Sequence, residues 1–163
     1  MIRYIAEESI FNSTADVLVN PVNCRGVMGK GLALEFKRRF PECEGPYKSA
    51  CESGQLRPGG LVLVRLQVEL EITSVRRPGI VLFATKDHWR GRSKIEWIEH
   101  GLASLKQRYS TWGVRSMGVP ALGCGLGGLR WEDVKPLVER YLEQEAVDVE
   151  VYLTSNEVQN RNR

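Results

Sequence analysis

Short apolar runs alternate along the chain with longer segments in which apolar residues recur at helical spacing. The runs are rich in Val, Ile and Leu, which is typical of strands buried on both faces of a sheet. They predict six strands, at residues 4–5, 17–19, 61–66, 80–84, 117–119 and 149–153.

Segments between these strands have the pattern of amphipathic helices. Ser93, with Glu96 three residues later, predicts the N-terminal cap of the longest one. In another, Pro136 is compatible with a helix only near its first turn. The expected helices lie at residues 32–40, at residues 95–109 and from residue 131 onward.

Alternating strands and helices predict an α/β fold in which a mostly parallel sheet is covered on both faces. Such sheets bind ligands beyond the carboxyl ends of their strands. The loops that follow the strands are therefore the first places to search for function.

Length and composition narrow the choice of protein class. With 163 residues, 42% of them apolar and 26% charged, the chain fits one globular domain. No apolar run approaches the roughly 20 residues of a membrane helix, and no signal peptide pattern opens the chain, so we expect a cytoplasmic protein. The four cysteines and two histidines are too irregularly spaced for a metal site, and we expect free thiols and no metal.

Two glycine-rich loops stand out. "VNPVNCRGVMGKGLALEFKRRFP" covers residues 19–41, and "VPALGCGLGGLRWEDV" covers residues 119–134. Each follows a strand and precedes a helix, where backbone N–H groups can approach an anion closely, so the pair could cradle two phosphates. Neither loop has the spacing of a P-loop or of a dinucleotide-binding fingerprint. The alternative is that both are simply tight strand-to-helix turns.

In these motifs the chain resembles the macrodomains, which bind ADP-ribose. The run Val19 to Asn23, followed by Gly26 to Ala33, resembles the first ligand loop of the DarG-type DNA ADP-ribosyl glycohydrolases, distant relatives of the terminal ADP-ribose protein glycohydrolase. Gly123 to Leu126 resembles the diphosphate loop of that branch, and Thr85-Lys86 resembles the place of its catalytic lysine. The resemblance covers nearly the whole chain.

The resemblance implies a three-layer α/β/α macrodomain with a mixed, mostly parallel six-stranded sheet. We expect this domain at residues 1–155 and a polar C-terminal tail at residues 156–163. The residues implied to bind ADP-ribose are Ser9, Ile10, Asn23, Gly26, Val27, Met28, Gly29, Lys30, Gly31, Thr85, Gly123, Cys124, Gly125, Leu126 and Gly127.

Lys86 and Asn23 are the residues for which the resemblance implies a catalytic role. The lysine would attack the anomeric carbon of a ring-opened ribose or stabilise charge as the glycosidic bond breaks. Both roles need a lowered pKa, for which repulsion from Arg90, Arg92 and Lys94 is a candidate cause. Asn23 would hold the hydroxyls of the distal ribose. On the residues alone, a solvated lysine and a turn asparagine are the alternatives.

The sequence departs from the family in two places. Gly127 occupies the position of an aspartate in the protein-directed relative, so hydrolysis of a glutamate-linked ADP-ribose is in doubt. Near the N-terminus, Ser9 aligns with the aspartate that meets adenine in many macrodomains. Glu7 or Glu8 would replace it if the register differs.

Basic residues follow both the first loop and the fourth strand, although the net charge of +3 alone is too small to indicate nucleic-acid binding. A DNA strand would meet such side chains through its phosphates. The alternatives are solvated helix faces and, for the tryptophan, packing. The candidate nucleic-acid contacts are Arg25, Arg38, Trp89, Arg90 and Arg92.

The expected function is removal of ADP-ribose from a nucleic-acid base, with thymidine in single-stranded DNA as the expected substrate. The expected partners are ADP-ribose, the modified DNA and a cognate ADP-ribosyltransferase toxin, with the chain acting as a monomer without a cofactor. The alternatives are an enzyme that processes ADP-ribose 1″-phosphate or O-acetyl-ADP-ribose, and a reader that binds ADP-ribose without turnover.

Overall fold

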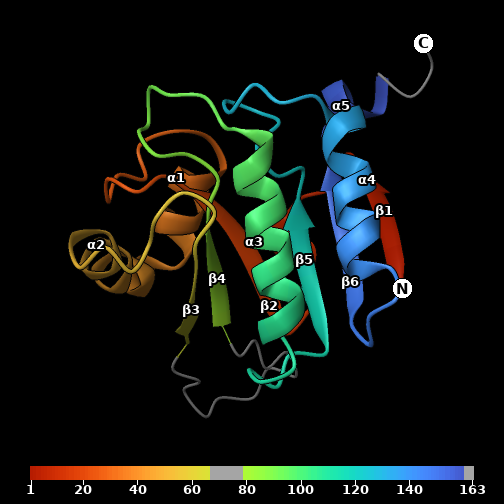
Figure 1. Cartoon of the computed structure of the whole chain (residues 1–163), viewed down its shortest axis with the longest axis horizontal. Helices are drawn as coiled ribbons and strands as arrows, with labels where there is room; N and C mark the ends of the chain where they lie inside the picture. The colour runs from red at the N-terminus through yellow and green to blue at the C-terminus, as the bar shows by residue number, and fades with distance from the viewer. Residues whose placement is uncertain (67–78, 160–163) are drawn as a thin grey trace.

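A six-stranded sheet with the strand order β1-β6-β5-β2-β4-β3 runs through the molecule (Figure 1). The computed structural model describes residues 1–66 and 79–159. The strands are parallel to their neighbours except β3, which pairs antiparallel with β4. The predicted mixed, mostly parallel sheet is confirmed. Its strands are β1 (Ile2–Ala6), β2 (Val17–Val22), β3 (Leu61–Arg65), β4 (Gly79–Ala84), β5 (Ser116–Pro120) and β6 (Asp148–Leu153).

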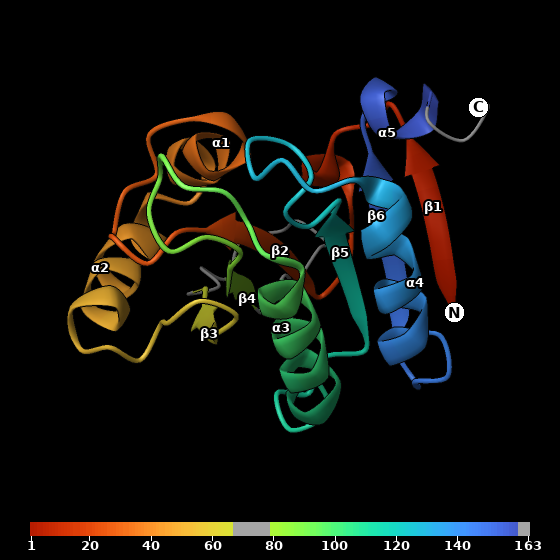
Figure 2. The same ribbon diagram turned by 45° about the horizontal axis from the view of Figure 1, so that its top comes forward.

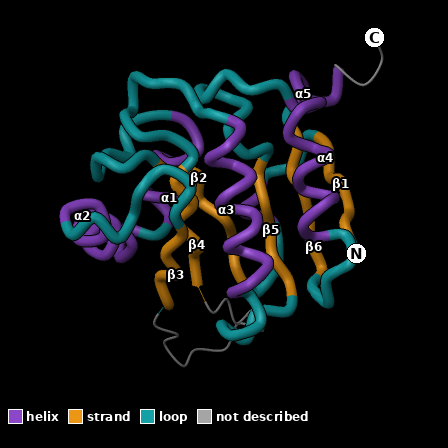
Figure 3. The backbone as a smooth tube through the Cα atoms, viewed as in Figure 1, coloured by secondary structure: helices purple, strands orange, loops and turns teal. Residues whose placement is uncertain are grey.

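Helices cover both faces of this sheet, which confirms the predicted three layers (Figure 3). On one face α3 and α4 pack side by side. On the other face lie α1 and α2, preceded by the short 3₁₀ helices η1 and η2, and α5 follows β6. The bounds are η1 (Ile10–Asn12), α1 (Gly31–Arg39), η2 (Pro41–Cys43), α2 (Glu44–Glu52), α3 (Ile95–Arg108), α4 (Trp131–Leu142) and α5 (Ser155–Gln159).

The sheet has one hydrophobic core on each face, which explains why the strands are continuous apolar runs in the sequence. Successive side chains of a strand point to opposite faces. Val17 and Val19 therefore pack with α3 and α4, whereas Leu18 between them packs with α1 and α2. The central strands are buried on both sides, so most positions along them are apolar, and Asn20 in β2 is a buried polar residue. Close approach of α3 to β4 needs Gly101, because a Cβ there would overlap the ring of Phe83.

Local details differ from the sequence predictions. Ser93 is not the cap of α3: Lys94 holds that position and makes no side-chain capping bond. The Ser93 hydroxyl is instead buried with no hydrogen-bond partner among residues 1–66 and 79–159. Pro136 lies in the second turn of α4 and not the first. Two helices, α2 and α5, carry no strong periodic signal in the sequence and were not predicted.

The C-terminal segment packs back onto the domain. In α5, Glu157 is buried and its carboxylate accepts hydrogen bonds from the backbone N–H and the hydroxyl of Thr154. Residues 156–159 of the expected tail thus belong to a packed helix, and residues 160–163 lie outside the described part. Within that described part, no helix has the length and apolar character needed to cross a membrane.

Candidate functional site

A cleft of about 1240 Å³ lies beyond the carboxyl ends of the parallel strands. Three loops border it: the first loop (residues 23–30) after β2, the lysine loop (residues 85–94) after β4 and the second loop (residues 121–130) after β5. Figure 2 shows these loops gathered over one end of the sheet. They converge because β2 pairs with both β4 and β5, although the three loops are far apart in sequence.

Both glycine-rich loops present backbone donors that have no partner among residues 1–66 and 79–159. In the second loop, the N–H groups of Gly125, Leu126 and Gly127 make no hydrogen bond to any described residue. Gly123 takes a positive φ of 74°, which turns the chain so that these donors follow one another around the bend. The first loop leads into the N-terminus of α1, where Lys30 provides no side-chain cap. Uncapped N–H groups at a helix start attract anions.

Asn23 holds the first loop in shape. Its amide nitrogen donates to Val27 O at 2.7 Å, and its Oδ1 accepts from the N–H of Arg25 at 2.9 Å. The Tyr47 hydroxyl lies 2.7 Å from Asn23 O and 2.9 Å from Asn23 Oδ1, so it also stabilises this turn. One amide hydrogen of Asn23 stays unassigned, and the side chain borders the cleft. Tyr47 escaped prediction because nothing local in the sequence ties α2 to this loop.

Lys86 reaches the cleft from the end of β4. Its position is fixed by the backbone, since Thr85 N donates to Val22 O at 2.9 Å. The ammonium nitrogen lies 3.5 Å from Trp89 O. Burial lowers the pKa of Lys86, and burial is the cause found for this shift. The expectation that neighbouring cations would lower the pKa is therefore corrected: the half-buried position of the amine does so.

The lysine loop is tied to the second loop at the mouth of the cleft. Ser93 N donates to Gly127 O at 3.0 Å, and Arg92 Nη2 donates to Gly128 O at 3.3 Å. These bonds join segments that the sequence separates by more than thirty residues. They connect the loop that carries Lys86 to the loop that carries the free backbone donors.

The opposite end of the cleft is acidic. Ser9 lies there, but its hydroxyl already accepts a hydrogen bond from Phe11 N at 3.2 Å as the cap of η1. Glu7 and Glu8 line the same end, as does Glu157 from α5. Glu7 has a positive φ of 58° and accepts from the Ser155 hydroxyl at 3.1 Å. Glu157 was missed by sequence reasoning because it lies in the segment expected to be a tail.

Most of the predicted site residues line this cleft. They are Ser9, Ile10, Asn23, Val27, Gly29, Lys30, Gly31, Thr85, Lys86, Trp89, Arg90, Arg92, Gly123, Gly125, Leu126 and Gly127.

Five predicted residues do not line it. Met28 is buried beneath the loop, where its sulfur accepts from the Asn20 amide at 3.6 Å. Arg25 turns away to pair with Asp87 at 3.2 Å. The other three are Gly26, Arg38 and Cys124. No cluster of three or more His, Cys, Asp or Glu side chains suited to a metal occurs in the described residues.

Comparisons with known proteins agree with this geometry. The family model "Macro domain" matches residues 19–138. A DNA ADP-ribosyl glycohydrolase of Thermus aquaticus is 40% identical, and the match covers 93% of this chain and 41% of that protein. A DNA ADP-ribosyl transferase-DNA ADP-ribosyl glycohydrolase fusion protein of Thermosipho africanus is 37% identical, with 91% of this chain and 41% of that protein covered.

Among solved structures, Thermosipho africanus DarTG in complex with ADP-ribose superimposes with a TM-score of 0.87 at 37% identity. That match covers 95% of this chain and 42% of that chain. The chain thus spans about two fifths of the length of the curated relatives it matches. The family match, the sheet order and the two glycine loops together establish that this chain belongs to the macrodomain family.

Proposed function

We propose that this chain is an ADP-ribosyl glycohydrolase that removes ADP-ribose from thymidine in single-stranded DNA. The observation that carries the proposal is the half-buried amine of Lys86, held in the cleft opposite the free donors of the second loop. The names of the relatives, a DNA ADP-ribosyl glycohydrolase and a transferase-glycohydrolase fusion protein, support the same chemistry.

Two features of the cleft support ADP-ribose as the ligand. The unpartnered N–H groups of the second loop and the uncapped start of α1 are suited to the two phosphates. The remaining amide hydrogen of Asn23 is suited to a ribose hydroxyl. We propose that the cleft residues from both loops bind the ligand. Met28, Gly26 and Cys124 do not line the cleft, and we propose that they support the conformation of the loops.

Lys86 would act at the anomeric carbon of the distal ribose. As a neutral amine it can attack that carbon in the ring-opened sugar, forming a C–N bond while the bond to the base breaks and the base takes up a proton. Water then adds to the same carbon and releases the lysine. As an ammonium it would instead stabilise the leaving base. Gly127 supplies no carboxylate, so in both versions the amine acts without an acidic partner at that position.

The proposal includes the partners of such an enzyme. Arg90, Arg92 and Trp89 border the cleft and are the better candidates for DNA contacts, because Arg25 is paired and Arg38 lies outside the cleft. An enzyme acting on DNA works where the DNA is, hence the cytoplasm in a bacterium. A DNA ADP-ribosyltransferase toxin would supply the substrate, and the chain would act as a monomer.

A direct assay tests the proposal. The protein is incubated with an ADP-ribosylated single-stranded oligonucleotide, with ADP-ribose 1″-phosphate, with O-acetyl-ADP-ribose and with glutamate-modified protein. We expect release of ADP-ribose from the oligonucleotide to be fastest by far. Faster turnover of a metabolite would establish a small-molecule enzyme instead, and binding without turnover of all four would establish a reader.

A further inference from the structure

Large apolar side chains are exposed at the mouth of the cleft. Val27 is 39% exposed, Trp89 47% and Leu126 67%, and each lines the cleft from a different loop. Met1 completes the exposed large apolar side chains of the described residues. Apolar exposure is thus concentrated at this mouth, where it indicates a surface that meets something larger than a free nucleotide.

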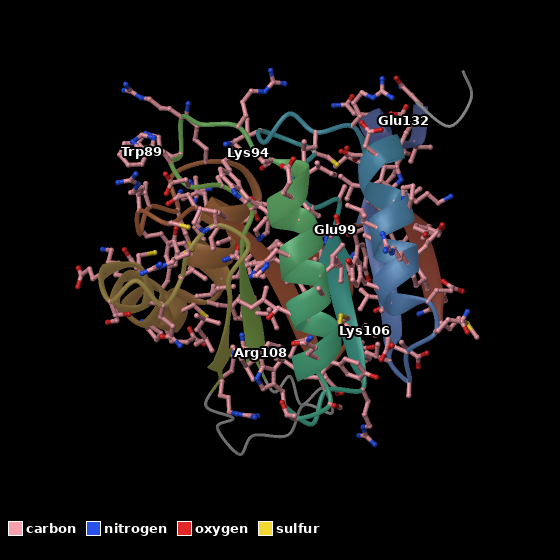
Figure 4. All side chains as sticks on the ribbon, in the orientation of Figure 1. Trp89, Lys94, Glu99, Lys106, Arg108 and Glu132 are labelled. Atoms are coloured by element: carbon pink, nitrogen blue, oxygen red, sulfur yellow. The ribbon has the colours of Figure 1, made fainter. Side chains whose placement is uncertain are left out.

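The Trp89 ring is held in place from one side. It stacks on His88, with ring centroids 3.8 Å apart and planes inclined by 29°. His88 is itself fixed, because its Nδ1 accepts from Arg90 N at 3.1 Å and its carbonyl accepts from Gly91 N at 2.9 Å. Figure 4 shows Trp89 projecting from the outer edge of the lysine loop. One face of the indole is covered and the ring is still half exposed, so a planar group can approach the other face.

Charges around Trp89 favour a polyanion. Arg90 and Arg92 follow it, and neither forms an ion pair within the described residues. Asp87, the nearby carboxylate of the same loop, is occupied by Arg25. The cleft carboxylates near β1 and α5 lie at the other end. The Arg92 guanidinium donates to Gly128 O through one nitrogen, whereas no ion pair holds Arg90 among the described residues. A fixed aromatic face beside such a guanidinium group is the combination that binds single-stranded nucleic acid, by base stacking and phosphate contacts.

We propose that Trp89, backed by His88, is a stacking platform for the DNA base next to the modified thymidine, with Arg90 holding the adjoining phosphate. This inference rests on the proposed function and names the part of the substrate that lies outside the ADP-ribose cleft. The carbonyl of Trp89 also accepts a hydrogen bond from the Lys86 amine at 3.5 Å, so the residue that carries the platform is in direct contact with the candidate catalytic group.

The test compares two substrates of the full chain: a ten-nucleotide single-stranded DNA with one ADP-ribosylated thymidine, and the ADP-ribosylated thymidine nucleoside alone. The measured quantity is the ratio of kcat/KM for the oligonucleotide to kcat/KM for the nucleoside. We expect Trp89→Ala to lower this ratio about tenfold or more, and Trp89→Phe to keep most of it, because a ring still offers a face. The backbone carbonyl that faces Lys86 is unchanged in both variants.

Tryptophan fluorescence gives an independent readout. An unmodified oligonucleotide should quench the wild-type emission, and Trp89→Phe should lose that quenching. Trp112→Phe is the matched control, because Trp112 packs against the core cluster of α3 and α4, beside Arg108. It should keep the quenching.

The possible outcomes separate the inference from the function on which it rests. If the wild type releases ADP-ribose from both substrates and Trp89→Ala leaves their ratio unchanged, the platform is refuted and the glycohydrolase stands. The same holds if an ADP-ribosylated peptide shows an equal dependence on Trp89. If the wild type releases ADP-ribose from neither substrate, the proposed function itself falls.

Discussion

Ser93 Oγ occupies the space where a side chain on Gly127 would begin. A Cβ on Gly127 would overlap this oxygen and the carbonyl oxygen of Gly123. The two residues are also bonded through their backbones, Ser93 N to Gly127 O at 3.0 Å. An aspartate at this position would therefore need the Ser93 side chain and the Gly123 backbone to move.

This packing predicts different effects on stability for substitutions of Gly127 and Gly125. Gly127→Ala should destabilise the fold by roughly 1–3 kcal/mol and weaken ADP-ribose binding, because the loop must shift to admit the methyl group. Gly125→Ala is the control for stability alone, since a Cβ there meets nothing within 4 Å in the free protein although Gly125 lines the cleft. Thermal unfolding with and without ADP-ribose measures both effects. Equal effects of the two substitutions would show that the overlap at Gly127 is relieved without strain.

Free ADP-ribose should stabilise the folded chain by mass action, by about 2.7 kcal/mol at a concentration one hundred times its Kd. AMP should give a smaller shift, since it reaches only part of the cleft. Gly29→Val should abolish the shift while the fold survives, because a Cβ on Gly29 contacts only Val27 Cγ1, at 3.5 Å. Calorimetry with no heat of binding at millimolar ADP-ribose would contradict the proposed ligand.

Lys86→Ala should slow release of ADP-ribose from modified DNA by about 10²–10⁴-fold, with ADP-ribose affinity changed by no more than about threefold. The substitution removes an amine and no backbone donor. Lys94→Ala is the matched control, because Lys94 lies over the Trp97 ring and outside the cleft. If the Lys86→Ala enzyme kept the parental rate, Lys86 would not be catalytic, and the mechanism would be assigned to Asn23 and a bound water.

The pH profile of the wild type distinguishes the two roles of Lys86. Burial disfavours the charged form and lowers its pKa, so the neutral amine becomes available below the ordinary lysine range of about 10.4. If the amine attacks, the rate rises with pH through the lowered pKa and then levels. A rate that falls through the same pKa would assign the work to the ammonium.

Asn23→Ala should weaken ADP-ribose binding and turnover together. It removes the bonds to Val27 O and Arg25 N and leaves the Tyr47 hydroxyl with fewer acceptors, a loss of roughly 1–3 kcal/mol of stability. Tyr47→Phe should reproduce part of that loss from outside the cleft. A double-mutant cycle measures the coupling, and strictly additive effects would mean that Tyr47 does not hold Asn23.

Turnover of modified DNA should decrease steeply with added salt, and binding of free ADP-ribose should decrease less. Arg90→Ala should reduce the slope of log kcat/KM against log salt by roughly 0.7–1, one phosphate contact. Lys106→Ala is the control, since Lys106 pairs with Glu145 at 3.1 Å and lies at the opposite end of the molecule (Figure 4). An unchanged slope in Arg90→Ala would show that this arginine is merely solvated.

The sequence was sufficient for the sheet and for the loops that border the cleft. All six predicted strands appear, because a strand buried on both faces needs a continuous apolar run that few other elements produce. The two loops could be predicted for a similar reason. Positive φ and close approach of the backbone favour glycine, so such loops are rich in glycine. Ser93 as a cap was wrong, because a capping pattern is judged locally and Ser93 is fixed by the second loop.

The tertiary structure decided what the loop residues do. Whether Arg25 is free or paired depends on Asp87, and whether Asn23 faces a ligand or its own loop depends on Tyr47, each brought near by a different element. Glu157 lines the cleft from α5, a helix too short to show a periodic pattern in the sequence. Hydrophobic periodicity is a property of neighbouring residues, so it fixes the elements. Charge pairing, hydrogen bonding and burial depend on distances between elements, and only the packed fold sets those distances.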